Sequence, residues 1–133
     1  KGGNLLLNVG PTARGTFDDR AQASLKAMGD WMRVNARSVY GCTEAPAGLV
    51  APPNTVLTYD PAANRLYVHL LAYPLDRIVL PGLAAKVKYA QFLHDASELR
   101  MGEGRGDEAG SLVVSLPVRK PPVEIPVLEV FLK

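Results

Sequence analysis

Positions 65–70 read Arg-Leu-Tyr-Val-His-Leu, and this stretch decides how the rest of the chain is interpreted. Leu66, Val68 and Leu70 alternate with polar or aromatic residues, which is the two-residue period of a β-strand. One face of such a strand points into an apolar core, and the other points to solvent or to an interface. His69 lies on that second face, so we expect a structural role for it rather than metal binding.

Short segments of the same character follow one another over the larger part of the chain. The predicted strands are 55–59, 65–72, 76–80, 86–94, 97–101, 111–116 and 127–132. Turn signals such as Asp60-Pro61 and Pro81-Gly82 separate them, and residues 102–110 are predicted as a long, mobile hairpin loop. This number and spacing of short strands predicts a mainly β fold, an antiparallel β-sandwich.

The sequence before the sandwich has a different pattern. The apolar run Asn4–Val9 stops at Gly10, which is typical of a strand buried on both faces of a parallel sheet. Asp18 or Asp19 then caps a predicted helix that extends to about Arg37, because a carboxylate accepts hydrogen bonds from the free N–H groups at a helix start. The apolar stripe of this helix consists of Ala21, Leu25, Met28 and Met32. We therefore expect three parts: a strand-turn-helix unit (1–41), a linker (42–54) and a sandwich domain (55–133).

Composition excludes several classes of protein. The chain has 133 residues, of which 47% are hydrophobic and 21% charged, as in an ordinary globular protein. Its net charge of +2 is too small for the basic surface of a nucleic-acid-binding protein. Cys42 is the only cysteine, which excludes a disulfide framework and a cysteine-rich zinc site. No apolar run approaches the roughly 18 residues of a membrane span, so neither nucleic acid nor membrane is an expected partner.

The residue types that carry catalysis do not form a recognisable pattern. The turn at 10–16 lacks the lysine of a phosphate-binding loop, and His69 and His94 lack metal-ligand spacing. Cys42 has no sequence signature of a nucleophile. Glycoside cleavage needs two carboxylates, but the acidic residues gather at the helix or around 98–108. We predict neither a catalytic residue nor a metal site in this chain.

The tyrosines allow one binding hypothesis. Tyr59, Tyr67, Tyr73 and Tyr89 fall in or beside predicted strands. Tyrosine is favoured in strands for packing alone, but a row of exposed rings would also suit stacking on sugars. Tyr73 and Tyr67 are the candidates for such stacking.

An ordered string of motifs gives the chain a family resemblance. The stretch at 1–12 reads KGGNLLLNVGPT, and Gly15, Gly29-Asp30-Trp31, Asn35 and Val39-Tyr40-Gly41 follow. Together they resemble the end of the catalytic domain of the α-L-fucosidases of glycoside hydrolase family 29. From Arg65 onward the chain is similar, more loosely, to the C-terminal β-sandwich of that family, through the segments 66–69, 80–83 and 116–117.

The resemblance implies that the chain is the C-terminal portion of a retaining glycosidase that releases terminal α-L-fucose from glycans. Such enzymes use an aspartate nucleophile and a carboxylic acid/base on a (β/α)8-like barrel, with no metal or organic cofactor. Asn4–Val9 corresponds to the last barrel strand, which brings Asn8 and Gly10 nearest to the substrate. The two catalytic carboxylates lie upstream of this motif, so none is assigned here.

Several expectations follow for the chain by itself. It should lack catalysis and supply a sandwich that buttresses the missing catalytic barrel, while a fucosylated glycan is the partner of the parent enzyme. The alternative is a carbohydrate-binding module that acts independently of the barrel. Without barrel neighbours, the strand within residues 1–10 should favour self-association into a homo-oligomer. Bacterial periplasmic, secreted and cytoplasmic locations all fit the sequence.

Overall fold

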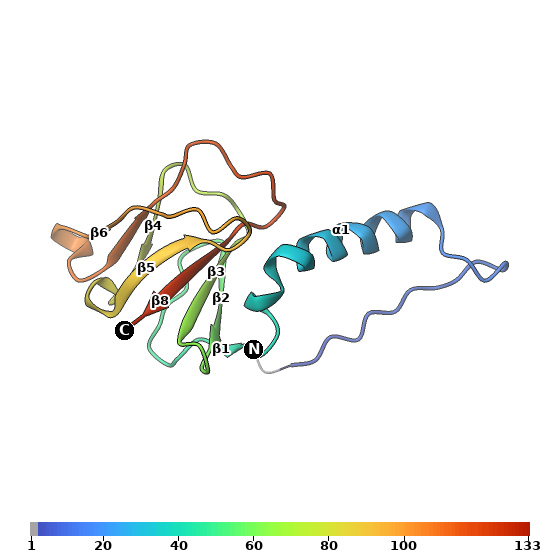
Figure 1. Cartoon of the computed structure of the whole chain (residues 1–133), viewed down its shortest axis with the longest axis horizontal. Coiled ribbons are helices and arrows are strands. Elements are labelled where there is room, and N and C mark those ends of the chain that lie inside the picture. The colour runs from blue at the N-terminus through green and yellow to red at the C-terminus, as the bar shows by residue number, and fades with distance from the viewer. Residues whose placement is uncertain (1–2) are drawn as a thin grey trace.

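The computed structural model describes residues 3–133 and contains two antiparallel sheets that face each other (Figure 1). The larger sheet has five strands in the order β1 (Thr43–Glu44), β2 (Thr55–Asp60), β3 (Arg65–Leu70), β8 (Val127–Leu132) and β5 (Val87–Phe92). The smaller sheet has three strands in the order β4 (Arg77–Leu80), β7 (Leu112–Ser115) and β6 (Met101–Glu103). The predicted antiparallel β-sandwich is therefore confirmed.

The core lies between the two sheets and follows from the alternation in residues 65–70. Leu66, Val68 and Leu70 of β3 point into it and are buried. Val68 lies opposite Leu128 of β8, so these neighbouring strands supply adjacent core side chains. The smaller sheet covers the core from the other side with Ile78, Leu80, Leu112 and Val114. A single apolar layer thus holds both sheets together.

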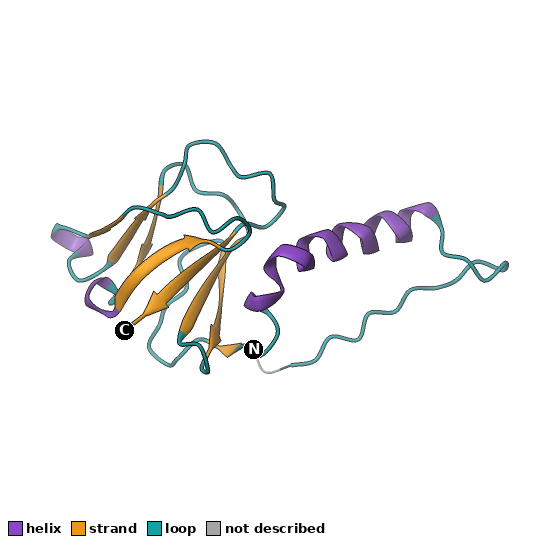
Figure 2. Ribbon diagram, viewed as in Figure 1, coloured by secondary structure: helices purple, strands orange, loops and turns teal. Residues whose placement is uncertain are grey.

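The predicted helix is present as α1 (Asp19–Asn35), and a 3-10 turn, η1 (Ala36–Ser38), continues it. Asp18 Oδ1 accepts a hydrogen bond of 2.8 Å from the N–H of Ala21, so Asp18 is the helix cap. Figure 2 shows that α1 projects away from the sheets and that only its C-terminal end reaches them. Met28, in the expected apolar stripe, is exposed for this reason. Within residues 3–133, no helix combines the length and apolar character that crossing a bilayer requires.

The prediction of a strand at Asn4–Val9 is wrong: within the described residues, this segment forms no strand. Leu5, Leu6 and Leu7 point into solvent, and Leu6 is 86% exposed. A parallel strand needs a neighbour on each side to satisfy its backbone groups. Residues 3–133 build only antiparallel sheets, and these do not take the segment up.

Four smaller features of the sandwich differ from the sequence prediction or add to it. Residues 97–101, predicted as a strand, connect the two sheets instead. They form one isolated β-bridge, between Glu98 and Gln91, and β6 begins only at Met101. The hairpin expected around 102–110 joins β6 to β7 and carries a 3-10 turn, η3 (Gly106–Glu108). A further 3-10 turn, η2 (Ala84–Lys86), precedes β5. The expected linker contributes β1, which was not predicted because two residues show no period.

We expect Leu128→Ala to lower the free energy of unfolding by about 3 kcal/mol, because it removes a fully buried side chain from the centre of the larger sheet. Urea denaturation followed by far-UV circular dichroism measures the change. Leu75→Ala is the matched control: Leu75 is 80% exposed, and its substitution should change stability by less than about 0.5 kcal/mol. Equal losses for both variants would contradict this placement of the core.

Candidate functional site

The larger sheet has a second face, which points away from the core and carries polar side chains. Tyr67 and His69 of β3 and Glu129 of β8 project from it, together with Gln91 of β5. All of these except Gln91 are buried. The C-terminal end of α1 covers one end of this face, and the other end forms an open hollow. The two ends have different chemistry.

At the covered end, Trp31 of α1 attaches the helix to the sheet. Its Nε1–H donates a hydrogen bond of 2.8 Å to the carbonyl oxygen of Ile125, just before β8. The indole ring also lies 6.0 Å from the ring of His69, centroid to centroid. Trp31 packs against a second apolar cluster, which consists of Tyr67, Leu93 and Val127. This anchor sets where α1 leaves the sandwich.

The protonation state of His69 follows from its neighbours. The Thr58 hydroxyl donates to the carbonyl oxygen of Ser38 at 2.6 Å, which uses its only hydrogen. His69 Nε2, 3.0 Å from Thr58 Oγ1, must then be the donor, which assigns the Nε2–H tautomer. Burial lowers the pKa of His69, and a hydrogen bond with the Ser38 backbone opposes this shift only in part. Neutral His69 is therefore the form that fits beneath Trp31.

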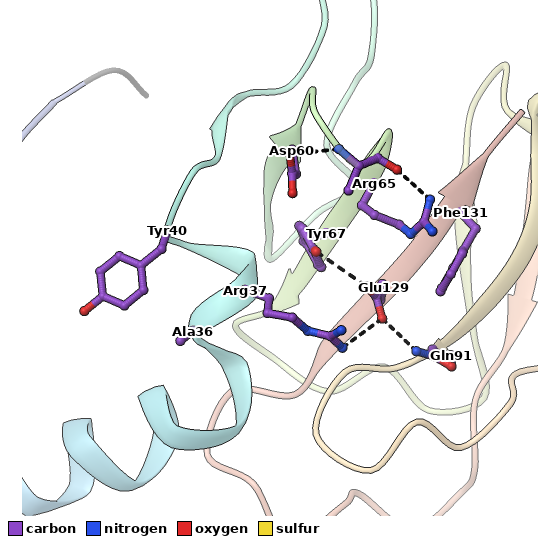
Figure 3. A pocket seen from close by; sticks show the side chains of 10 residues that line it. Ala36, Arg37, Tyr40, Asp60, Arg65, Tyr67, Gln91, Glu129 and Phe131 are labelled. Atoms are coloured by element: carbon purple, nitrogen blue, oxygen red, sulfur yellow. Dashed lines mark hydrogen bonds and ion pairs between the residues drawn. The ribbon is translucent and has the colours of Figure 1, made fainter.

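At the open end, Glu129 forms the floor of a hollow of about 400 Å³, which we call the Glu129 hollow (Figure 3). Its side chain is only 4% exposed. Gln91 Nε2 donates to Glu129 Oε2 at 2.7 Å, and Arg37 Nη2 lies 3.3 Å from the same oxygen. The hydroxyl of Tyr67 donates to Oε1 at 3.4 Å. Residues from η1 and from three neighbouring strands thus meet at one carboxylate.

The phenol of Tyr67 is a permanent donor in this network. Burial and the nearby charge of Glu129 raise the pKa of Tyr67 to about 12. A phenol with such a pKa stays protonated at neutral pH, so it keeps donating to the carboxylate. The buried charge of Glu129 is therefore compensated by hydrogen bonds as well as by the Arg37 guanidinium.

The rim of the hollow is rigid on the Arg65 side. The guanidinium of Arg65 lies 3.8 Å from the centre of the Phe131 ring. Tyr89 meets the same ring edge-on, with 5.3 Å between centroids and 80° between planes. Arg65 Nη1 also donates to the carbonyl oxygen of Ala63 at 2.7 Å. Tyr40, by contrast, points away from Glu129 (Figure 3). Arg65 is thus held in place by the sheet itself.

The residues singled out from the sequence lie elsewhere or are covered. Asn8 and Gly10 are exposed in the extended N-terminal segment, and neither lines the Glu129 hollow. Tyr67 is only 2% exposed and presents no free ring face. Tyr73 is half-buried; its hydroxyl donates to the carbonyl oxygen of Pro117 at 2.7 Å, and burial raises its pKa. The structure does not bring these four residues together.

Sequence reasoning missed Arg37, Gln91 and Glu129. One signal was available: Glu129 interrupts the otherwise apolar stretch 127–132, and a charge inside a buried strand needs partners. Those partners come from distant parts of the chain, so they could not be named in advance. Within the part of the chain that the structure describes, no group of three or more His, Cys, Asp or Glu side chains is arranged to hold a metal ion.

We expect the free energy of unfolding to fall as the pH drops below about 6.5, the ordinary value for histidine. The unfolded chain binds a proton at His69 before the folded chain does, so acid favours unfolding until the lowered folded-state pKa is passed. His69→Gln keeps an N–H donor for Thr58 and should remove this part of the pH dependence. Urea denaturation at a series of pH values tests this, and parallel profiles for the two proteins would contradict it.

Comparisons with known proteins agree with the motif string. A family model described as alpha-L-fucosidase matches residues 1–37. Human plasma alpha-L-fucosidase is 34% identical over 74 residues, which is 55% of this chain and 16% of that protein. The alpha-L-fucosidase of Dictyostelium discoideum is 45% identical over 40 residues, or 30% of this chain and 9% of that protein. The chain therefore spans a small part of the length of these relatives.

Solved structures extend the likeness to the sandwich. Alpha-L-fucosidase isoenzyme 1 from Paenibacillus thiaminolyticus superposes with a TM-score of 0.84 at 34% identity, over 98% of this chain and 31% of that one. The Thermotoga maritima alpha-fucosidase, in complex with a mechanism-based inhibitor, superposes with a TM-score of 0.75 at 25% identity, over 97% of this chain and 30% of that one. The family resemblance predicted from the sequence is confirmed: the chain is similar to alpha-L-fucosidases both in its motif string and across its sandwich.

Proposed function

We propose that the chain is the C-terminal portion of a retaining α-L-fucosidase and that its sandwich buttresses a (β/α)8-like barrel formed by upstream residues. The exposed apolar segment that contains Leu5, Leu6 and Leu7 carries this proposal. Leucines do not stay in water when a protein can bury them, and in this position a last barrel strand would be buried on both faces. The likeness to the Paenibacillus enzyme covers 98% of the chain, so it includes most of this segment.

The parts of the chain have different roles in this proposal. Residues 1–41 belong to the barrel, residues 55–133 form the sandwich domain, and residues 42–54 are the linker between them. Trp31 and Arg37 fix the C-terminal end of α1 to the larger sheet, at Ile125 and Glu129. The sandwich thereby holds the last barrel helix in one direction, and the barrel buries the leucines and the exposed side of α1.

The chemistry of fucoside hydrolysis supports a non-catalytic role for this portion. A retaining glycosidase needs two carboxyl groups about 5 to 5.5 Å apart, one as nucleophile and one as acid/base. The buried carboxylate of this structure, Glu129, has both oxygens engaged by Gln91, Arg37 and Tyr67. The family resemblance implies that both reacting groups come from upstream and that Asn8 and Gly10 border the substrate at the end of the last barrel strand.

A carbohydrate-binding module working through Tyr73 and Tyr67 has less support. Stacking on a sugar needs an exposed ring face, and Tyr67 is buried beneath the α1 anchor.

Homo-oligomer formation through residues 1–10 follows from the exposed leucines Leu5, Leu6 and Leu7. Without the barrel, these side chains would associate with a second copy of the chain.

Hydrolysis of an aryl α-L-fucoside tests the proposal. The 133-residue chain should release no chromophore above background, and a version extended upstream through a whole barrel should be active. Activity in the short chain would show that its own carboxylates catalyse the reaction, which contradicts the proposed role. Inactivity in the long version would contradict α-L-fucosidase activity of the parent.

The buttress role has its own test in the same assay. Adding the short chain to a separately produced upstream part should restore hydrolysis. Leu6→Asp should reduce the restored rate of hydrolysis at least about tenfold, because it places a charge in the proposed barrel interior. Leu75→Asp is the matched control, since Leu75 is exposed on the sandwich, and it should leave the rescue intact. Equal rescue by both variants would contradict docking through the leucine segment.

A further inference from the structure

We propose that the Glu129 hollow binds one neutral sugar unit of a glycan, with Glu129, Gln91 and Arg65 as the groups that contact its hydroxyls. This site is distinct from Tyr73 and Tyr67, the residues expected from the sequence to stack on sugars. It does not depend on α-L-fucosidase activity of the parent, because every group that forms it belongs to this chain.

The shape of the hollow suits a ligand of that size. Its volume of about 400 Å³ lies near the lower end of the range for small-molecule sites, about 300 to 1,000 Å³. Side chains from β3, β8 and β5 form the floor, while Ala36 and Arg37 of η1 form one wall. The turn from Asp60 to Ala63 forms the opposite side. A site on three neighbouring strands is more rigid than one on loops.

The charges around the hollow favour a neutral ligand. Two guanidinium groups, on Arg37 and Arg65, and two carboxylates, on Asp60 and Glu129, line the hollow. Their formal charges cancel, so neither an anion nor a cation gains a net attraction. The residues nonetheless offer both strong donors and strong acceptors within one hollow. A polyhydroxyl ligand is the class that uses both, because each hydroxyl donates one hydrogen bond and accepts others.

Hydrogen-bonding capacity remains at the floor. A carboxylate accepts about four hydrogen bonds, and within the described residues Glu129 accepts three. Gln91 uses one amide hydrogen on Glu129, which leaves the other hydrogen and the carbonyl oxygen for a ligand. Since Glu129 is almost fully buried, a hydrogen bond to its carboxylate would be charge-assisted and poorly screened by water.

Arg65 supplies a donor that is already in place. The Phe131 ring and the carbonyl oxygen of Ala63 hold its guanidinium, so little side-chain freedom would be lost on binding. Two adjacent sugar hydroxyls could then be held between Glu129 as acceptor and Arg65 as donor. Affinity would still be modest, because a single sugar unit has few atoms and the hollow is open.

Nuclear magnetic resonance titration of the 133-residue chain tests this inference, with L-fucose and D-galactose as neutral probes and D-galacturonate as an anionic one. We expect at least one neutral sugar to give saturable shifts at the backbone amides of Gln91, Glu129 and Phe131. The dissociation constant should be on the order of 1 mM. D-galacturonate should bind no more tightly than the better neutral sugar, because the charges of Arg37 and Arg65 cancel those of Glu129 and Asp60.

Matched variants decide whether the hollow is responsible. Arg65→Ala and Gln91→Ala should each weaken binding at least about fivefold. Arg77→Ala removes an arginine of similar position, at the start of a strand of the other sheet, and should leave the affinity unchanged. Absence of saturable shifts up to about 50 mM, shifts located outside the hollow, or equal effects of Arg65→Ala and Arg77→Ala would each overturn the proposal.

Discussion

The strand on which the structure depends most is β8, because it is the last strand in the sequence and lies inside the larger sheet. β3 and β5 are both hydrogen-bonded to β8, so they are joined into one sheet only after the end of the chain has inserted between them. Leu128 and Val130 of β8 then complete the core, and Glu129 completes the polar second face. A pairing between segments so far apart in sequence is costly to form, and it makes folding of the sandwich cooperative.

The second face of the sheet shows how a helix and a sheet are joined without a large apolar contact. Trp31 supplies one directional hydrogen bond, to Ile125, and a small apolar cluster beneath it. Arg37 adds an ion pair with the buried carboxylate of Glu129. Polar contacts of this kind contribute less to stability than the burial of apolar surface does, but they form only when the helix lies in one orientation. They therefore orient α1 while leaving most of its length exposed. The proposed packing of α1 against an upstream barrel requires this geometry.

The sequence predicts strands correctly where the two-residue alternation of apolar side chains extends over several residues. The alternation at 65–70 and at 127–132 predicts β3 and β8 because a half-buried strand places every second side chain in the core. The run Asn4–Val9 also has the pattern of a buried strand, but within residues 3–133 it pairs with no other strand. The Glu129 hollow could not be predicted, since Arg37 and Glu129 are 92 positions apart and only the folded sheet brings them together.

We infer that the sandwich is stable by itself, whereas the segment before α1 has no pairing partner within residues 3–133. Amide hydrogen exchange, followed residue by residue at a concentration at which the 133-residue chain is monomeric, tests this inference. We predict that β3, β8 and β5 exchange only by global unfolding, that protection in α1 is highest near Trp31, and that residues 4–9 exchange at the rate of an unstructured peptide. Protection of residues 4–9 equal to that of β3 in the monomeric chain would contradict this inference, because the segment would then have a stable partner within the chain.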